Sequence, residues 1–280
     1  MKIKVSHENI YEYDSPVFLE SHIIKLHPRN EPSQLIKVFN IKIEPNPVCI
    51  TKYLDVEGNF VIQTWFNDLT DYLKVETNFE IETSRENPFD FYTDPIDLQF
   101  PFEYQQNLTE TIQPYIKKQL IHDISLKNFI NGLEKDSKGN IFDFLILLNQ
   151  QINEFFKYKI REEGEPYSAE KTFSLKEGSC RDFAMFFIEV CRQKGIAARF
   201  MSGYRHSKEN KGAHYLHAWV EVYIPGGGWR GFDPTEGIAI DKNYIALAAS
   251  YDSQNTLPIV GTTRSKNAKS SFTSKIFLED

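Results

Sequence analysis

The stretch EGSCRDFAMFFIEVCRQKG, residues 177–195, places Cys180 immediately before a helical pattern. Apolar residues recur every three or four positions from Phe183 to Cys191, and Gly195 provides a helix stop. A cysteine nucleophile has to be a thiolate, and the unpaired backbone N–H groups at a helix N-terminus stabilise that negative charge. The position alone suits a small buried residue equally well, so Cys180 is either a nucleophile or part of the core.

The other two cysteines are expected to be structural. Cys191 lies on the apolar stripe of the same helix and Cys49 lies in a strand pattern, so both are predicted to fill the core. Three scattered cysteines are too few for a disulfide framework or a thiolate metal site. We therefore expect reduced thiols, no cofactor and no metal site, while calcium stays open because no EF-hand-like loop is present to argue from.

The first part of the chain has the pattern of β-strands. From residue 1 to residue 83, apolar and polar residues alternate in runs separated by turn residues, as in KIKVSHENIYEY and YLKVETNFEIET. This alternation is typical of antiparallel strands with one buried face, and it predicts a β-sandwich of about six to eight strands. We assign this β-sandwich to a first domain of residues 1–100.

The pattern becomes helical in the second part of the chain, residues 101–280. The segment 141–156 is apolar almost all round, which suits a buried helix, and the helix after Cys180 follows it. Helices followed by strands in one unit predict an α+β fold. The strand patterns are IAARFMSGY, HYLHAWVEVYIP, WRGFDPT and, at the end of the chain, KIFLED.

A candidate general base lies in HYLHAWVEVY. Strand alternation puts His217 on the face opposite to the aliphatic residues of this segment. His214 falls on the other face, so the two imidazoles are poorly placed to share a metal ion. The sequence has no HExxH motif and no paired CxxC motif, which disfavours a zinc enzyme.

A candidate for the group that orients the imidazole follows in PGGGWRGFDPT. The glycines turn the chain back in a hairpin, and the returning strand ends at Asp233 before Pro234. A carboxylate bonded to the second imidazole nitrogen holds a catalytic histidine in place. Asp233 lies on the same face of the sheet as His217 if the hairpin loop between their two strands has an odd number of residues. The alternative is an Asx turn before the proline.

These motifs resemble those of the bacterial transglutaminase-like proteins, whose papain-like core follows an N-terminal β region. The resemblance implies that the helix bearing the cysteine packs on an antiparallel sheet. The resemblance is carried by GSCRDFAMFFIEVCRQKGIAARFMSGY, HAWVEVYIPGGGWRGFDPTEG, SPVFLESHIIKLHPR and NPFDFY, and it extends from Val5 to Gly261. In that family the cysteine of GxCxDFA, the histidine of HAWVE and the aspartate of FDPT form the catalytic triad. The resemblance therefore implies a triad of Cys180, His217 and Asp233.

The rest of the cleft is less well defined by the sequence. The backbone N–H of Cys180 is the natural first oxyanion donor, and Tyr167 is a candidate for the second. Animal transglutaminases use a tryptophan upstream of the cysteine, but here the upstream tryptophan, Trp65, lies in the first domain. Trp219 and Trp229 are expected either to wall an acyl-binding cleft or to pack the sheet.

Composition excludes several classes of partner. The net charge of −7 and the pI near 5.6 leave no basic stripe for a nucleic acid or an anionic membrane. No segment approaches the roughly 18 apolar residues of a membrane span, and residues 1–17 lack the apolar region of a secretory signal. We expect a cytoplasmic protein whose oligomeric state the sequence leaves open.

The candidate residues predict a thiol enzyme that forms a thioester with a peptide or protein substrate. Hydrolysis of the thioester makes it a cysteine protease or amidase, and amine acceptance makes it a transglutaminase. A transferase needs a dry acceptor channel, because most lysine amines are protonated near pH 7 and water competes with them. Few residues could wall such a channel, so hydrolysis is favoured. A non-catalytic binding module is the remaining alternative.

Overall fold

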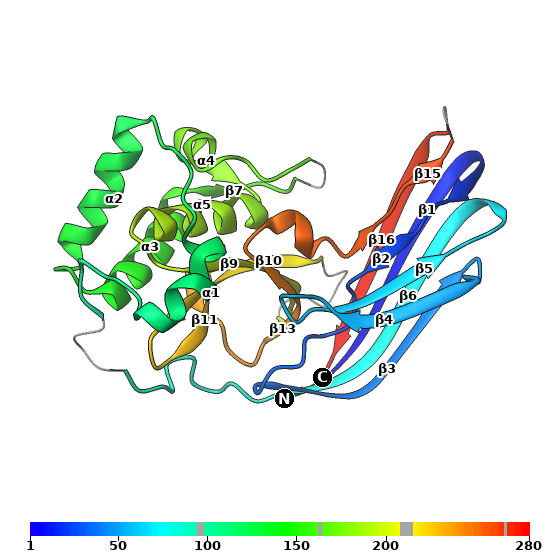
Figure 1. The fold of residues 1–280 in the computed structure, drawn as a ribbon, viewed down its shortest axis with the longest axis horizontal. Helices are drawn as coiled ribbons and strands as arrows, with labels where there is room; N and C mark the ends of the chain where they lie inside the picture. The colour runs from blue at the N-terminus through cyan, green and yellow to red at the C-terminus, as the bar shows by residue number, and fades with distance from the viewer. Residues whose placement is uncertain (94–97, 162–163, 208–214, 266–267) are drawn as a thin grey trace.

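The computed structural model describes residues 1–93, 98–161, 164–207, 215–265 and 268–280. Figure 1 shows two parts that lie side by side. In one part, five helices gather around a central sheet, and in the other part long strands form a β region on the opposite side of that sheet.

The β region contains two antiparallel sheets that enclose a shared apolar core. The first sheet has the order β15-β1-β6-β3, with β16 also paired to β1, and the second has the order β14-β2-β5-β4. The predicted alternation is clear in β1, where every second residue from Ile3 to Asn9 is buried. The strands are β1 (Lys2–Leu19), β2 (His22–Ile24), β3 (Gln34–Glu44), β4 (Cys49–Leu54), β5 (Phe60–Trp65), β6 (Leu69–Thr83), β14 (Ile259–Val260), β15 (Thr263–Arg264) and β16 (Ser270–Glu279).

Both ends of the chain build the β region. β14 pairs with β2, and β15 and β16 both pair with β1, so that Lys4 lies opposite Glu279. β14, β15 and β16 therefore lie outside the helical part, although the sequence assigned their residues to a second domain of residues 101–280. The physical reason is that the open edge of β1 has backbone N–H and C=O groups that require partners.

The second part confirms the predicted α+β class. Its sheet has the strand order β12-β11-β10-β9-β13, and the aliphatic face of β10 shares one apolar core with α5. Its elements are α1 (Gln106–Ile116), α2 (Ile124–Asp136), α3 (Ile141–Phe155), β7 (Lys157–Tyr158), α4 (Ala169–Leu175), β8 (Glu177–Gly178), α5 (Cys180–Gln193), β9 (Ala198–Arg205), β10 (His217–Ile224), β11 (Gly228–Asp233), β12 (Ile238–Ala239), β13 (Tyr244–Ser250) and the 3₁₀ turn η2 (Ser253–Thr256).

The two parts also share an apolar core. Tyr204 on β9 and Ile245 and Leu247 on β13 are fully buried among the apolar side chains of the β region. The sheet is therefore covered by α5 on one face and by the β region at β9 and β13. This contact makes the β region part of the support of the central sheet.

The cysteines outside the candidate site differ in burial. Cys191 is completely buried in α5, as predicted. Cys49 is exposed, which contradicts the predicted core position. The reason is that β4 is the edge strand of its sheet and all six of its residues are exposed.

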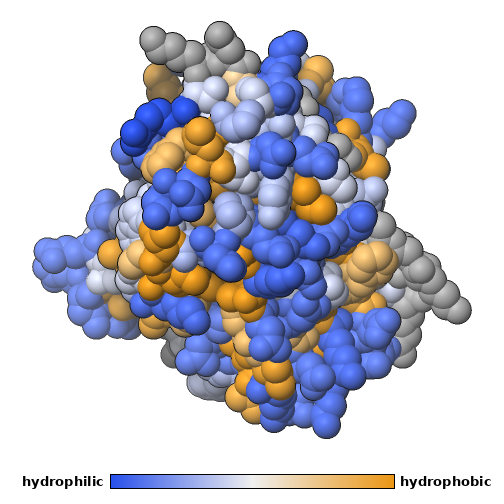
Figure 2. Space-filling model, turned by 90° about the vertical axis from the view of Figure 1, so that its right-hand side faces the viewer, coloured by the Kyte–Doolittle hydropathy of each residue, from blue (hydrophilic) through white to orange (hydrophobic). Residues whose placement is uncertain are grey.

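Figure 2 shows that apolar side chains are scattered among hydrophilic ones on the end of the molecule formed by the β region.

Candidate active site

α5 begins at Cys180, at the N-terminal end predicted from the sequence. Ser179 is the N-cap residue, and both its amide (2.7 Å) and its hydroxyl (2.8 Å) donate to Asp182 Oδ2 in the first helical turn. Cys180 itself is 8% exposed. The thiol therefore lies at a well-ordered helix end, where backbone N–H groups point toward it.

Asp182 also holds the loop that precedes α4. Its Oδ1 atom accepts the amide of Tyr167 at 2.7 Å, and the guanidinium of Arg161 donates to both of its oxygens. Burial opposes ionisation of this carboxyl, but the hydrogen bonds from Tyr167, Ser179 and Arg161 outweigh it and lower the pKa. Asp182 thus fixes the helix start and the neighbouring loop to each other.

His217 and Asp233 meet at the ends of two neighbouring strands. The register of β10 and β11 places Val220 opposite Phe232, so Asp233 points to the same side of the sheet as His217. The Nε2 atom of His217 lies 2.6 Å from Oδ2 of Asp233. The register therefore fulfils the condition that the sequence left open.

The electrostatics of His217 favour its charged form. Burial alone would lower its pKa, but the charge of Asp233 and the hydrogen bond to it, with a smaller contribution from the neighbouring Cys180, raise the pKa to about 10. Because Nε2 is bonded to Asp233, the Nδ1 atom is the one left for Cys180. The imidazole therefore lies between the thiol and the carboxylate, with its side chain 14% exposed.

Asp233 is completely buried and well supplied with donors. Its Oδ1 atom accepts the amides of Thr235 (2.9 Å) and Glu236 (3.4 Å), and its Oδ2 atom accepts the hydroxyl of Tyr244 at 2.8 Å. Burial opposes ionisation, yet the charge of His217 and these hydrogen bonds lower its pKa. Sequence reasoning missed Tyr244, because a tyrosine that begins a strand of small and apolar residues looks like a core residue.

Tyr167 contacts residues of its own loop, of α4 and of the first turn of α5. Its ring is stacked between the cations of Arg161, at 3.8 Å, and Lys171, at 3.7 Å. Its amide is committed to Asp182. These contacts give Tyr167 a structural place in the loop before α4, and its candidacy as an oxyanion donor gains no support.

The two candidate tryptophans pack the sheet. Trp219 is 1% exposed, and its ring stacks 6.4 Å from the ring of His217. Trp229 pairs with Tyr223, six residues from His217 along β10, which corresponds to roughly 20 Å. Its ring packs against Tyr115 at 5.0 Å and beneath the guanidinium of Arg199 at 4.2 Å. Neither side chain walls an open cleft at the triad, and His214 lies outside the described residues.

Tyr158 is a second residue that sequence reasoning missed. It lies opposite Gly178 in the short parallel pairing of β7 with β8, directly before Cys180, and it is 49% exposed. Burial and the negative charge at Cys180 and Asp233 raise its pKa to about 12, so the phenol stays protonated at neutral pH. The hydroxyl of Tyr158 is therefore available as a hydrogen-bond donor near the N-terminal end of α5.

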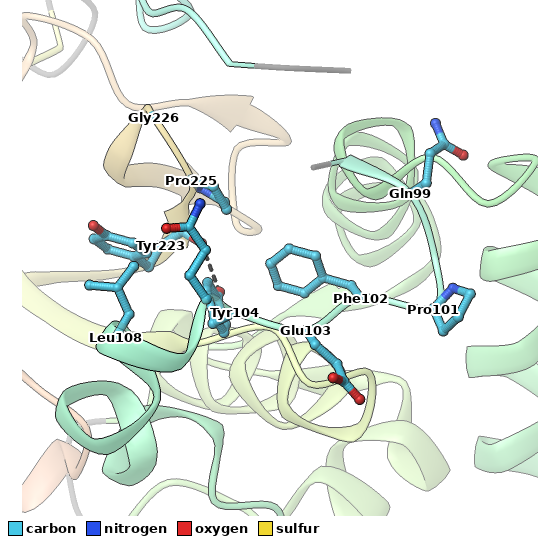
Figure 3. A pocket seen from close by; sticks show the side chains of 10 residues that line it. Gln99, Pro101, Phe102, Glu103, Tyr104, Leu108, Tyr223, Pro225 and Gly226 are labelled. Carbon is cyan, nitrogen blue, oxygen red and sulfur yellow. Dashed lines mark hydrogen bonds between the residues drawn. The ribbon is translucent and has the colours of Figure 1, made fainter. Parts of the chain in front are cut away.

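A cavity lies away from these residues. It has a volume of about 190 Å³ and is formed by the segment 99–105 and by the turn after β10 (Figure 3). The hydroxyl of Tyr104 is already used there, because it donates to the carbonyl of Tyr223 at 2.8 Å and accepts the amide of Ala197. This cavity is at the opposite end of β10 from His217.

The part of the chain that the structure describes offers no cluster of three or more His, Cys, Asp or Glu side chains that could hold a metal ion. Within the same residues, no helix is both long and apolar enough to cross a membrane.

Two family models match the two parts of the chain. The model of the transglutaminase-like superfamily matches residues 128–234, which include Cys180, His217 and Asp233, and the model of the bacterial transglutaminase-like N-terminal region matches residues 3–82. The chain belongs to the transglutaminase-like superfamily. This membership confirms the resemblance found in the sequence motifs.

Relatives of this transglutaminase-like protein differ in how much of the chain they share. The protein Rv2569c of Mycobacterium tuberculosis H37Rv is 24% identical over 289 residues, which cover 95% of this chain and 90% of that protein. The protein ML0607 of Mycobacterium leprae is 32% identical over 96 residues, 32% of this chain and 34% of that protein. The protein-glutamine gamma-glutamyltransferase of Pseudomonas aeruginosa is 35% identical over 77 residues, 25% of this chain and 12% of that enzyme.

A solved structure shows the same fold over the whole chain. It is the crystal structure of a candidate cysteine protease from Cytophaga hutchinsonii, with a TM-score of 0.69 over 100% of this chain and 98% of that one. The two sequences are 20% identical, so the likeness shows the common fold.

Proposed function

We propose that this protein is a thiol enzyme that hydrolyses an amide bond in a peptide or protein substrate through a thioester on Cys180. The observation that carries the proposal is the position of His217, which bonds Asp233 at 2.6 Å and lies close enough to Cys180 for the cysteine to contribute to its raised pKa. A nucleophile, a base and an orienting carboxylate in this arrangement are the groups that covalent acyl transfer requires.

The reaction follows from the charge on the imidazole. Because the pKa of His217 is raised to about 10, the imidazole is protonated near pH 7, and its positive charge favours attack by the sulfur of Cys180 as a thiolate. The new C–S bond forms at the substrate carbonyl, the imidazolium gives its proton to the leaving nitrogen, and the C–N bond breaks. Water, deprotonated by His217, then attacks the thioester, releases the acid and restores the thiolate.

The oxyanion needs two donors, and we assign the second one to Tyr158. The backbone N–H of Cys180, at the first position of α5, is the first donor. The strand that carries Tyr158 is held beside the nucleophile, because the amide of Lys159 donates to the carbonyl of Gly178 at 2.8 Å. The protonated phenol of Tyr158, which lies opposite Gly178 on this strand, is the donor that we assign to the oxyanion.

Exposed apolar side chains next to the triad support a peptide substrate. Tyr158 lies opposite Gly178, which is two residues before Cys180. Tyr215 lies two residues before His217, and Ile238 on β12 pairs with Asp233 on β11. All three are exposed although they are large. We infer that they contact apolar side chains of the substrate on both sides of the scissile bond.

Hydrolysis is favoured over transfer to an amine because the tryptophans that could shield the thioester pack the sheet instead. Acyl transfer from a glutamine amide is the second candidate function, and the local similarity to the gamma-glutamyltransferase of Pseudomonas aeruginosa favours it. A binding module without turnover is disfavoured, because all three triad side chains are present and His217 is bonded to Asp233.

The cellular setting belongs to the same proposal. All three cysteines are free thiols, which suits a reducing compartment such as the cytoplasm. The net charge of −7 supports a protein or peptide partner over a nucleic acid.

The experiment that tests the function uses a peptide library with mass readout, and then one cleaved amide with and without millimolar primary amine. Free acid as the main product, absent with Cys180→Ala, is the expected result. An amine adduct that dominates at neutral pH would replace the hydrolase with the transglutaminase. A library left intact by the wild-type protein would favour the binding module.

A further inference from the structure

We propose that Tyr244 is a positioning residue of this site, that its hydroxyl fixes Asp233, and that the N-terminal β region holds Tyr244 in place through two side-chain amides bound to β13. The inference rests on the proposed function, because it concerns how the same triad is kept in geometry. The β region would then contribute to catalysis by holding β13, and with it Tyr244, in place beside the triad.

The hydroxyl of Tyr244 and the imidazole share one oxygen. Tyr244 donates to Oδ2 of Asp233 at 2.8 Å, and His217 Nε2 lies 2.6 Å from the same atom. The other oxygen is held by the amides of Thr235 and Glu236 in the turn after β11. The backbone thus fixes one oxygen, and Tyr244 is the side chain that fixes the direction of the oxygen facing the imidazole.

The ring of Tyr244 has little freedom to move. It is 4% exposed and lies edge-on to the ring of Trp219, with centroids 5.5 Å apart. The centroid of the His217 ring is 6.2 Å away from that of Tyr244. Trp219 packs against both Tyr244 and His217, so the three rings contact one another beside the triad.

β13, which carries Tyr244, is the edge strand of the central sheet, and the β region supplies its outer partners. Gln34 donates to the carbonyl of Ala246 at 3.0 Å and accepts the amide of Ala246 at 3.0 Å. Asn59 donates to the carbonyl of Ala249 at 2.9 Å and accepts the amide of Ala249 at 2.8 Å. Each amide reproduces the two-way bonding of a neighbouring strand, and both side chains are buried.

Further contacts fix β13 on both sides of these amides. The hydroxyl of Thr83 donates to the carbonyl of Lys242 at 2.6 Å, just before Tyr244. Ile245 and Leu247, which flank the first amide contact, are buried in the core of the β region. Tyr244 cannot change position unless β13 separates from the β region, so the β region determines where the hydroxyl meets Asp233.

The test follows the alkylation of Cys180 by iodoacetamide against pH, which needs no knowledge of the substrate. A Cys49→Ser background removes the exposed second thiol. Tyr244→Phe keeps the ring and removes the hydroxyl. Oδ2 of Asp233 then loses one hydrogen-bond donor and stabilises the protonated form of His217 more strongly. The alkaline side of the profile of alkylation rate against pH (the basic limb) reports the loss of the proton from His217. We expect this basic limb to move to higher pH by roughly half a unit. The shift should vanish when Asp233→Asn is also present.

Two matched controls separate positioning from general loss of packing. Tyr204→Phe removes another buried phenol hydroxyl, one that contacts His7 at 2.8 Å, and should leave the profile unchanged. Gln34→Ala with Asn59→Ala should move the basic limb in the same direction as Tyr244→Phe. Gln63→Ala should not, because its amide donates to Ser21 within the β region. Circular dichroism and thermal unfolding establish that each variant is folded.

Each outcome is decisive. A Tyr244→Phe profile that matches the wild-type profile, or a shift of equal size with Tyr204→Phe or in the Asp233→Asn background, would overturn the role of Tyr244. A shift with Tyr244→Phe but not with the paired amide substitutions would overturn the role of the β region. Slow wild-type alkylation that does not change with His217→Ala would remove the proposed function and this inference with it.

Discussion

The Nε2 atom of His217 lies 2.6 Å from Oδ2 of Asp233, and this contact joins the first residue of β10 to the last residue of β11. The carboxylate is fully buried, while the imidazole is 14% exposed at the strand end. The arrangement keeps water from the carboxylate and leaves the imidazole accessible to a substrate. It is the geometry on which the proposed chemistry depends.

Asp233→Asn should leave the fold intact and lower kcat by about two to four orders of magnitude. The amide has nearly the same shape as the carboxylate, but it can stabilise the wrong imidazole tautomer and cannot support an imidazolium. Kinetics with the cleaved peptide and circular dichroism are compared in parallel. Asp252→Asn, which alters an N-cap at η2, is the matched control. Near wild-type turnover of Asp233→Asn would remove Asp233 from the triad.

The raised pKa of His217 predicts a pH dependence of stability. Its folded pKa of about 10 exceeds the usual 6.5, so the stabilisation is fully present below pH 6.5 and is lost as the pH rises through about 10. The difference in free energy of unfolding between wild type and Asp233→Asn should therefore shrink from pH 6.5 to pH 10. Urea unfolding of both proteins across this range measures it, and a constant difference would show that the pair is not charged.

The three cysteines should label at different rates. Cys180 should react with iodoacetamide below pH 7, because His217 supplies the positive charge that stabilises a thiolate. Cys49 is exposed on the edge strand β4 and should label more slowly than Cys180 at that pH, while the burial that raises the pKa of Cys191 should protect it until unfolding. Peptide mapping of labelled protein distinguishes the three. Faster labelling of Cys49 than of Cys180 at pH 6 would contradict the account.

Tyr158→Phe tests the second oxyanion donor. Removing one such donor typically lowers kcat by about 10²–10³-fold. The ring and its contact with Phe183 at 6.4 Å are kept, so KM should change little. Tyr72→Phe, which removes an exposed phenol hydroxyl on β6 of the β region, is the control. An unchanged kcat would show that the hydroxyl of Tyr158 does not reach the oxyanion.

The features predictable from the sequence are those encoded by short stretches. The helix after Cys180 and the hairpin that ends at Asp233 depend on local periodicity and on a glycine turn, and both are present. The segment 141–156 likewise forms α3, whose N-cap Asn140 accepts the amides of Phe142 and Asp143. Local signals of this kind are contained within about a dozen residues.

The features that sequence analysis missed depend on contacts between distant segments. Tyr244 reaches Asp233 only through the placement of β13 at the edge of the sheet. The pairing of β16 with β1 joins residues more than 250 positions apart, as at His7 and Ile276. The exposure of Cys49 follows from the edge position of β4, which alternation within a strand does not reveal.

The most direct test of the central claim is the mass of the acylated protein. Wild-type protein is mixed with an activated acyl donor, quenched in acid within the first turnover, and mapped by mass spectrometry next to Cys180→Ala and Cys49→Ser. The account predicts one acyl group on the peptide that contains Cys180, in wild type and in Cys49→Ser but not in Cys180→Ala, and its release by hydroxylamine. An adduct on another residue, or an equal adduct in Cys180→Ala, would contradict the assignment of Cys180 as the nucleophile.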